Sequence, residues 1–315
     1  MRLEFQHIFK SFSGTPILKD VTFQAQSGKA MGFLGRNGAG KTTTIRTLMN
    51  VFPPDSGQFI LDGKTIDRRN TKIGYLPEER GMYQNVPIID QLIYFGELKQ
   101  MSRKDAKEAG MRWLKYLELE DWARKKLETL SKGNQQKVQI TQAVLNDPDI
   151  LILDEPFSGL DPVNAQVLKE LIHNFIAKDR IVLFSSHQMG YVEEFCDDIT
   201  FIQDGRIILS SDLNEIKRET GKGKLRIKVN NLSDAELSGK LSTITDILIT
   251  NDRKSLIVSL LNGKTHHTFL KEIMDMGLPI ELFSYYEPSL EDIFIQLEED
   301  KNPEEPVAQM EGASK

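Results

Sequence analysis

The chain has 315 residues, with 46 acidic and 40 basic side chains and a formal net charge of −6. This length is too great for one small domain and suggests two, with ample chain for a sizeable core. Residues 298–315 hold six acids and two bases, a net of −4, so the remainder is close to neutral. A near-neutral body gives no support to a nucleic-acid-binding surface.

Cysteine content and hydropathy exclude further classes of protein. The single cysteine, Cys196, rules out an internal disulfide and any multi-cysteine metal site, and it is compatible with a reducing compartment. We expect it to be a small buried residue. No apolar run approaches the roughly eighteen residues of a membrane span, and the N-terminus lacks a signal-peptide pattern. A membrane function would therefore need its pore from another polypeptide.

The first strands lead into a glycine-rich loop. Strands are predicted over Arg2–Phe9, Ile17–Gln26 and Ala30–Leu34. Next comes Gly35–Thr42, Gly-Arg-Asn-Gly-Ala-Gly-Lys-Thr, which fits G-x-x-x-x-G-K-[ST]. A helix is predicted over Thr43–Met49, so the loop joins a buried strand to a helix N-terminus, as a phosphate-binding loop requires.

The chemistry of this loop points to a nucleotide triphosphate. Glycines let the backbone wrap so that N–H groups and the positive end of the helix converge on phosphate oxygens. Lys41 adds a charge for the β- and γ-phosphates, and the Thr42 hydroxyl is a ligand for Mg²⁺. The nucleotide-binding residues predicted here are Gly35, Asn37, Gly38, Ala39, Gly40, Lys41, Thr42 and Thr43.

Beyond the loop, strands and helices alternate. A hairpin is predicted where Asp62-Gly63 separates Gln58–Leu61 from Lys64–Ile66, and a helical block is predicted over residues 86–130. Further strands are expected at Ile73–Leu76, Ile150–Leu153, Ile181–Ser185 and Ile199–Gln203, and further helices near Asn134–Leu145, Val163–Ala177 and Gln188–Phe195. This interleaving predicts a mostly parallel α/β sheet with an all-helical insertion.

Two carboxylates follow the strand at Ile150–Leu153. Alone, Asp154-Glu155 could be a solvated turn after a buried strand. Downstream of a phosphate-binding loop, the pattern favours Asp154 as part of the Mg²⁺ shell and Glu155 as the group that orients and deprotonates water. Successive side chains of a strand point to opposite faces, so the two carboxylates can take these two different roles.

A second pattern begins after a charged linker predicted at Arg218–Lys224. Its β-α-β-β-α-β order suggests a small α+β sandwich of ferredoxin-like type. The predicted elements are Leu225–Val229, Ser233–Gly239, Ile244–Thr250, Ser255–Leu261, Thr265–Met276 and Ile280–Tyr285, followed by a helix at Ser289–Leu297. The acidic tail 298–315 is predicted to be disordered.

Three further segments carry a family resemblance. Leu130–Lys137 resembles the ABC signature sequence, Ser158–Pro162 resembles the D-loop, and His187 closes a strand as the switch histidine does. Together with the Walker A and B patterns, they are similar to an ABC-transporter nucleotide-binding domain over about residues 2–210. The resemblance implies a RecA-like core, an antiparallel β subdomain and a helical subdomain at about 86–130, all within residues 1–217. It also implies an accessory domain at 223–297.

The resemblance also implies residue roles. In this family two domains pack head to tail, and each ATP lies between one Walker A loop and the partner's signature. Ser131, Gly133 and Asp161 would then contact nucleotide across the dimer, and His187 would bind the γ-phosphate. Ser131 alone could be a simple N-cap. Phe12 lies where the family stacks an aromatic ring on adenine, with a core aromatic as the alternative. The remaining histidines are expected to be ordinary: His7, His173, His266 and His267.

The chain departs from the family pattern at a few positions. Glu78 stands where the Q-loop glutamine is usual; a carboxylate ligates Mg²⁺ at least as well as an amide, but it cannot donate a hydrogen bond when ionised. Lys132 and Asn134 replace a glycine and a glutamine of the signature.

Segments around Glu78 and Pro288 resemble the ABC-2 exporter branch, which includes NatA-like sodium-extruding and antibiotic-resistance ATPases. The chain is therefore expected to be the ATPase subunit of an exporter of sodium or drugs, with ATP and Mg²⁺ as ligands. Its partners would be an integral-membrane permease and a second ABC ATPase domain, from a homodimer or a close paralogue. It would be cytoplasmic, held on the inner face of the cell membrane by the permease. The alternatives are a soluble ABC ATPase acting on ribosomes or DNA, and a non-enzymatic regulatory binder.

Overall fold

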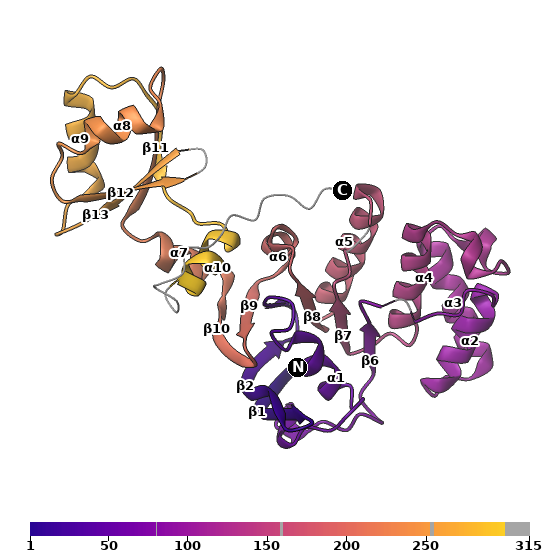
Figure 1. Ribbon diagram of the computed structural model, residues 1–315. Coiled ribbons are helices and arrows are strands. Elements are labelled where there is room, and N and C mark those ends of the chain that lie inside the picture. Colours follow the sequence, from indigo (N-terminus) through magenta and orange to yellow (C-terminus); the bar gives the residue numbers. More distant parts are fainter. Residues whose placement is uncertain (80, 158–159, 253–254, 300–315) are drawn as a thin grey trace. The chain divides into compact units, whose positions relative to one another are not determined.

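The computed structural model describes residues 1–79, 81–157, 160–252 and 255–299 (Figure 1). The chain forms two compact units, Met1–Leu213 and a second unit that begins at Asn214. No helix in the described part of the chain combines the length and the apolar character that crossing a bilayer requires.

A six-stranded sheet forms the centre of the first unit. Its strand order is β10 (Arg206–Asp212), β9 (Asp198–Gln203), β3 (Ala30–Leu34), β8 (Ile181–Ser186), β7 (Ile150–Asp154) and β6 (Ile73–Leu76). All neighbours are parallel except β10, which is antiparallel to β9. Strands β3, β7 and β8 are buried along their whole length, as expected of a parallel sheet covered on both faces. The predicted α/β sheet is confirmed.

A four-stranded antiparallel sheet packs against this one. It has the order β2 (Thr15–Gln26), β1 (Arg2–Phe12), β4 (Ser56–Leu61) and β5 (Lys64–Thr65). The ring of Phe23 stacks on Phe5 at 4.1 Å and on Phe33 at 5.1 Å, and Phe33 belongs to β3. These buried rings therefore join the two sheets in one core.

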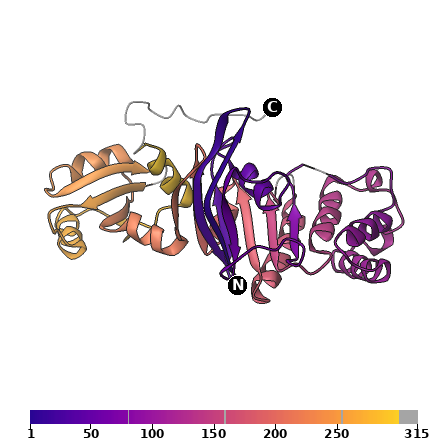
Figure 2. The same cartoon turned by 90° about the horizontal axis from the view of Figure 1, so that it is seen from below.

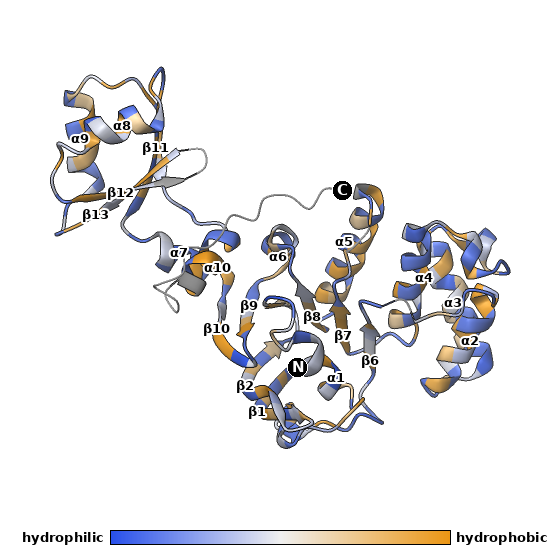
Figure 3. Ribbon diagram, viewed as in Figure 1, coloured by the Kyte–Doolittle hydropathy of each residue, from blue (hydrophilic) through white to orange (hydrophobic). Residues whose placement is uncertain are grey.

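Helices follow the parallel strands and also form a separate group. Helices α1 (Lys41–Leu48), α5 (Pro162–Ala177) and α6 (Met189–Phe195) come after β3, β7 and β8. Helices α2 (Ile88–Leu98), α3 (Arg103–Tyr116) and α4 (Lys132–Val144) lie together beyond β6 in both views (Figures 1 and 2). In Figure 3, β7 is hydrophobic along its length while these helices carry both hydrophilic and hydrophobic residues, as amphipathic helices do.

The second unit confirms the predicted β-α-β-β-α-β order. Its elements are β11 (Lys224–Val229), α8 (Asp234–Leu241), β12 (Ile247–Asp252), β13 (Ser255–Leu260), α9 (His266–Asp275) and β14 (Ile280–Tyr285). The sheet has the order β12-β13-β11-β14 and is antiparallel throughout. Leu225, Ile227, Phe269 and Ile273 are central to its core.

Two predictions need correction here. The linker expected at Arg218–Lys224 is helical at its start, because α7 (Leu213–Gly221) extends into it and ends at Gly221. Leu213 is buried and Ile216 is half-buried, while an acid in the first turn and Arg218 in the last complement the helix dipole. The last helix, α10 (Leu290–Glu299), runs slightly past the predicted start of the tail. The tail from residue 300 onward lies outside the described residues.

Candidate functional site

The predicted phosphate, metal and catalytic residues lie at the carboxyl ends of neighbouring strands. Strands β3, β8, β7 and β6 are adjacent and parallel, so their carboxyl ends share one edge of the sheet. The pairing places Leu34 beside Ser186 and Asp154 beside Ser185. The glycine-rich loop, His187, Glu155 and Glu78 each follow one of these four strands.

The loop after β3 presents a free helix start. Helix α1 begins at Lys41, and Gly40 supplies no side-chain hydrogen bond to it. The backbone N–H groups of its first turn, Lys41 and Thr42 among them, are therefore available to an anion. Both the loop and the uncapped helix start match the requirement for binding phosphate.

Lys41, the first residue of α1, is buried next to this edge of the sheet, with only 7% of its surface exposed. Its Nζ donates to the carbonyl oxygens of Gly35 at 2.6 Å and Arg36 at 3.3 Å. Burial lowers the pKa of Lys41, while the nearby carboxylates of Glu155, Asp154 and Glu78 raise it. The structure thus brings one ammonium group and three carboxylates into electrostatic contact.

Asp154 ends β7 as a buried carboxylate with an unused oxygen. Its Oδ1 accepts a hydrogen bond from the hydroxyl of Ser185, while Oδ2 is buried and has no hydrogen-bond partner among the described residues. The nearby Tyr75 hydroxyl is also buried, and burial, followed by the charge of Asp154, raises its pKa to about 12.

A buried unpaired carboxylate oxygen is costly unless a ligand satisfies it. Asp154 and the hydroxyl of Thr42 together are hard oxygen donors, which fits Mg²⁺. Within the described residues there is no cluster of three or more His, Cys, Asp or Glu side chains that could hold a metal alone. This donor set fits an ion that keeps phosphate and water ligands, as Mg²⁺ does.

Glu155 and His187 form a pair at the same edge. Glu155 is 6% exposed, and its Oε1 lies 2.8 Å from Nδ1 of His187. Its Oε2 accepts from the Ser186 hydroxyl at 3.2 Å. The pair holds the carboxylate in one orientation, and the His187 side chain is about half exposed and reaches solvent. The arrangement suits a base oriented by a neighbouring imidazole.

Phe12 lies at the end of β1 and is 43% exposed, which contradicts the core alternative. Its ring meets Phe52 edge-on at 5.0 Å, and the Lys10 ammonium lies 5.5 Å from the ring centre. The sequence did not predict a role for Phe52, because no pattern in the residues around it indicates that its ring packs against Phe12. An exposed, supported ring can stack on a base.

The signature-like residues lie elsewhere in the unit, at the start of α4. Ser131 is the exposed N-cap of α4, and its hydroxyl accepts from the Asn134 N–H at 3.4 Å. Gly133 packs beside Asn164 at the start of α5.

Asp161 caps α5 through the N–H groups of Val163 and Asn164, each at 3.0 Å. These hydrogen bonds hold the Asp161 carboxylate and lower its pKa. Ser158 and Gly159 lie outside the described residues.

Gly205, in the turn between β9 and β10, supports the phosphate loop and was missed. Its N–H donates to Ala39 O at 3.0 Å, and its carbonyl accepts from the Lys19 N–H at 2.7 Å. A Cβ there would overlap the carbonyl oxygen of Ile17, and φ is +77°. The Asp204-Gly205 dipeptide is a hairpin signal that could have predicted both this turn and β10.

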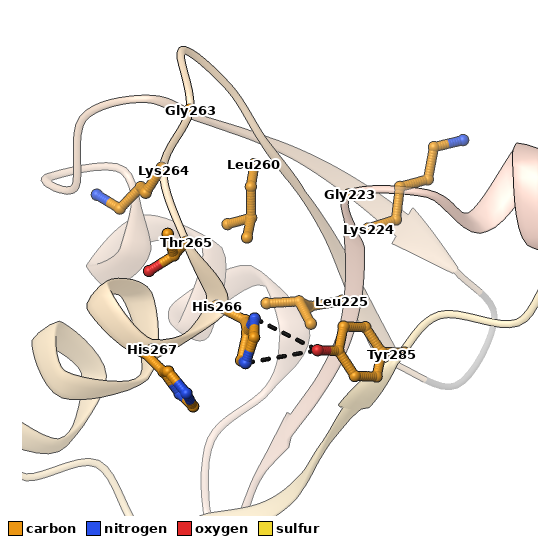
Figure 4. Close-up of a pocket in the computed structure, with 10 residues that line it drawn as sticks. All are labelled: Gly223, Lys224, Leu225, Leu260, Gly263, Lys264, Thr265, His266, His267 and Tyr285. Carbon is orange, nitrogen blue, oxygen red and sulfur yellow. Dashed lines mark hydrogen bonds between the residues drawn. The ribbon is translucent and has the colours of Figure 1, made fainter.

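The second unit contains a separate hollow of about 390 Å³ (Figure 4). His266 and Tyr285 point toward one another across it, with the tyrosine hydroxyl 3.3 Å from Nδ1. Leu225 and Leu260 also line it. None of the described predicted site residues belongs to this hollow, so it is independent of the sheet-edge site.

Each of the two units contains a match to a known protein family. The family described as ABC transporter matches residues 18–158, from β2 through the Glu155 segment. The family described as ATP-binding protein DrrA1-3-like, C-terminal domain, matches residues 212–297. The chain thus combines two sequence families in the order of its two compact units.

Individual proteins show the same similarity. The ABC transporter ATP-binding protein YhaQ of Bacillus subtilis is 38% identical over 296 residues, covering 93% of this chain and 97% of that protein. The Nod factor export ATP-binding protein I of Burkholderia lata is 31% identical, covering 65% and 69%. A solved structure, described as the ATP binding subunit of an ABC transporter, has a TM-score of 0.64 at 28% identity and covers 77% of this chain and 100% of that one.

Proposed function

This chain belongs to the ABC transporter family of ATP-binding proteins, and from that premise we propose that it is the ATP-hydrolysing subunit of an exporter with a separate permease. The observation that carries the proposal is the meeting of Lys41, the half-satisfied carboxylate of Asp154 and the Glu155–His187 pair at one sheet edge. These are the groups that phosphoryl transfer to water requires.

The residues of this edge divide the chemistry between them. Lys41 and the N–H groups of α1 bind and orient the triphosphate. Glu155 orients the attacking water and accepts its proton, and His187 holds that carboxylate while its exposed ring contacts the γ-phosphate. Exposed Phe12 stacks on the base.

Thr42 and Asp154 would hold Mg²⁺, with Glu78 nearby. Bound there with the nucleotide, the ion would neutralise charge that develops on the β- and γ-phosphate oxygens. The unpaired Oδ2 of Asp154 is the feature of this chain that supports the assignment.

A second copy, or a close paralogue, completes the site. Ser131 is exposed at the N-terminus of α4, where backbone N–H groups favour an anion. These groups start a helix that lies beyond β6, apart from α1 of the same chain (Figure 1). We infer that they bind the nucleotide of the partner domain, so that ATP closes a head-to-tail dimer and hydrolysis reopens it.

A permease would receive this motion near the end of β6. A hollow of about 290 Å³ lies there, and Tyr75, Pro77, Met82 and Phe95 are among its lining residues. Its apolar lining suits a helical segment of a membrane protein. Such docking would place the chain on the inner face of the membrane. Export direction is supported by the relative described as a Nod factor export ATP-binding protein.

The test is Glu155→Gln, which keeps the shape of the side chain but removes the base. ATP hydrolysis should fall by at least about a hundredfold, and the variant should form an ATP-dependent dimer on size-exclusion chromatography. Adding Lys41→Ala to this variant should abolish the dimer by removing nucleotide binding. A strictly monomeric profile at saturating Mg-ATP, or unchanged hydrolysis, would refute the proposal.

A further inference from the structure

A buried side chain joins the start of α4 to the segment that carries Glu155. Gln136 is 8% exposed, and its Nε2 donates to the carbonyl oxygen of Pro156 at 2.6 Å. Pro156 directly follows Glu155. A short hydrogen bond in a buried site is a strong positional restraint, because its loss would leave a carbonyl unsatisfied.

A second contact links the same helix start to the chain farther along. A Cβ on Gly133 would lie 2.6 Å from Nδ2 of Asn164, so the backbone of α4 packs directly on that side chain. Asn164 donates in turn to the carboxylate of Asp161, the N-cap of α5. The N-terminus of α4 is therefore tied both to the residue after Glu155 and to the start of the next helix.

Glu155 has a backbone conformation that needs such restraint. Its φ is +50°, a left-handed value that costs a non-glycine residue about 1 kcal/mol or more. The Glu155 N–H donates to Ser185 O at 3.0 Å, and Gln136 holds the carbonyl of the following residue, Pro156. Hydrogen bonds thus hold the peptide group before Glu155 and the peptide group after Pro156, and together they restrict the direction of the Glu155 side chain.

We propose that Gln136 is a positioning residue for Glu155, through which the N-terminus of α4 sets the carboxylate that activates water. The inference rests on the proposed function, in which Ser131 and Gly133 bind the triphosphate held by the partner domain. A shift of that helix start on binding reaches Glu155 through one buried amide. The partner's nucleotide, bound by Ser131 and Gly133, thereby adjusts Glu155, the base that acts on the nucleotide held by this chain.

Two substitutions remove the donor in different ways. Gln136→Met fills a similar volume without a hydrogen bond, and Gln136→Glu keeps the shape but cannot donate when ionised. For both we expect kcat for phosphate release to fall about tenfold while KM for ATP stays within about twofold. The matched control is Gln91→Met, since buried Gln91 also donates to backbone carbonyls, those of Tyr83 and Val86 at 2.8 Å, in a segment that holds no predicted site residue. Its kcat should not change.

The outcomes separate this inference from the proposed function. A kcat within about twofold of the parent in both Gln136 variants would overturn the inference. A joint loss of kcat, ATP affinity and melting temperature in both would also overturn it, since Gln136 would then only support folding. If Gln136→Met in the Glu155→Gln background still forms the ATP-dependent dimer, the proposed function stands whichever result the kinetics give. Failure of Glu155→Gln itself to dimerise refutes the proposed function instead.

Discussion

Glu78 contributes a negative charge to a site that already contains two carboxylates. It is exposed, yet its charge acts on buried Lys41 together with those of Asp154 and Glu155. We expect Glu78→Gln to raise the Mg²⁺ concentration for half-maximal ATPase activity about fivefold, because one attractive charge is lost. A magnesium titration of phosphate release measures this. Glu79→Gln, on the adjacent exposed residue, is the control, and identical titrations for both variants would show that Glu78 has no special role.

Gly205 offers a test of backbone packing behind the phosphate loop. Gly205→Ala should lower the free energy of unfolding by about 2 kcal/mol or more and weaken ATP binding, because the new methyl group overlaps Ile17 O and displaces Ala39. Gly63→Ala is the matched control: its φ is +78°, but its Cβ would meet nothing within 4 Å. That change should cost about 1 kcal/mol and leave ATP affinity intact. Equal losses on chemical denaturation would contradict the packing argument.

At the scale of elements, a half-buried lysine joins α2 to the end of α4. The Nζ of Lys99 donates to the carbonyl oxygens of Gln142 at 2.7 Å and Ala143 at 3.1 Å. Burial lowers the pKa of Lys99 from 10.5 to about 8. A neutral amine still has two N–H groups, enough for both carbonyls.

This shift makes stability depend on pH. Between pH 8 and 10.5 the unfolded chain binds more protons at Lys99 than the folded chain, so the free energy of unfolding rises with pH. From pH 8 to pH 9 the gain should be about 1 kcal/mol. Denaturation of Lys99→Met should lack this gain, whereas the exposed Lys104→Met should retain it. Parallel curves for Lys99→Met and the parent would contradict the assignment.

At the scale of the whole molecule, the exposed start of α4 should decide assembly. In the Glu155→Gln background, Ser131→Arg should prevent the ATP-dependent dimer, because a long cation replaces a small N-cap where two domains would meet. Ser102→Arg removes the equivalent N-cap of α3, a helix without predicted site residues, where the Ser102 hydroxyl accepts from the Asp105 N–H at 3.1 Å. It should dimerise normally. Dimerisation of both variants on size-exclusion chromatography would argue against the head-to-tail arrangement.

Much of the fold and of the candidate site follows from local sequence pattern. The buried strands that lead into Gly35, Glu155 and His187 belong to one parallel sheet, and parallel strands place their carboxyl ends together. The second unit was predictable for a similar reason, since each of its strands and helices has a clear period.

Other features could not be predicted because they depend on contacts between distant segments. Gln136 reaches Pro156 through a side chain whose direction no local pattern encodes. Gly205 is required by the close approach of Ile17, almost two hundred positions earlier in the sequence. The end of α7 was mistaken for the start of a linker because the glycines and lysines at 221–224 suggested flexibility, whereas burial of Leu213 favours the helix.

The turn at Gly205 has a consequence for ligand choice. It bonds to Ala39 of the phosphate loop and to Lys19 of β2, the strand that pairs with the end of β1 where Phe12 lies. The distance from the aromatic ring to the phosphate loop is therefore set by main-chain bonds. With Phe12 stacked on the base as proposed, a fixed distance would select for the length of the sugar and phosphate chain between base and terminal phosphate, whichever base is stacked.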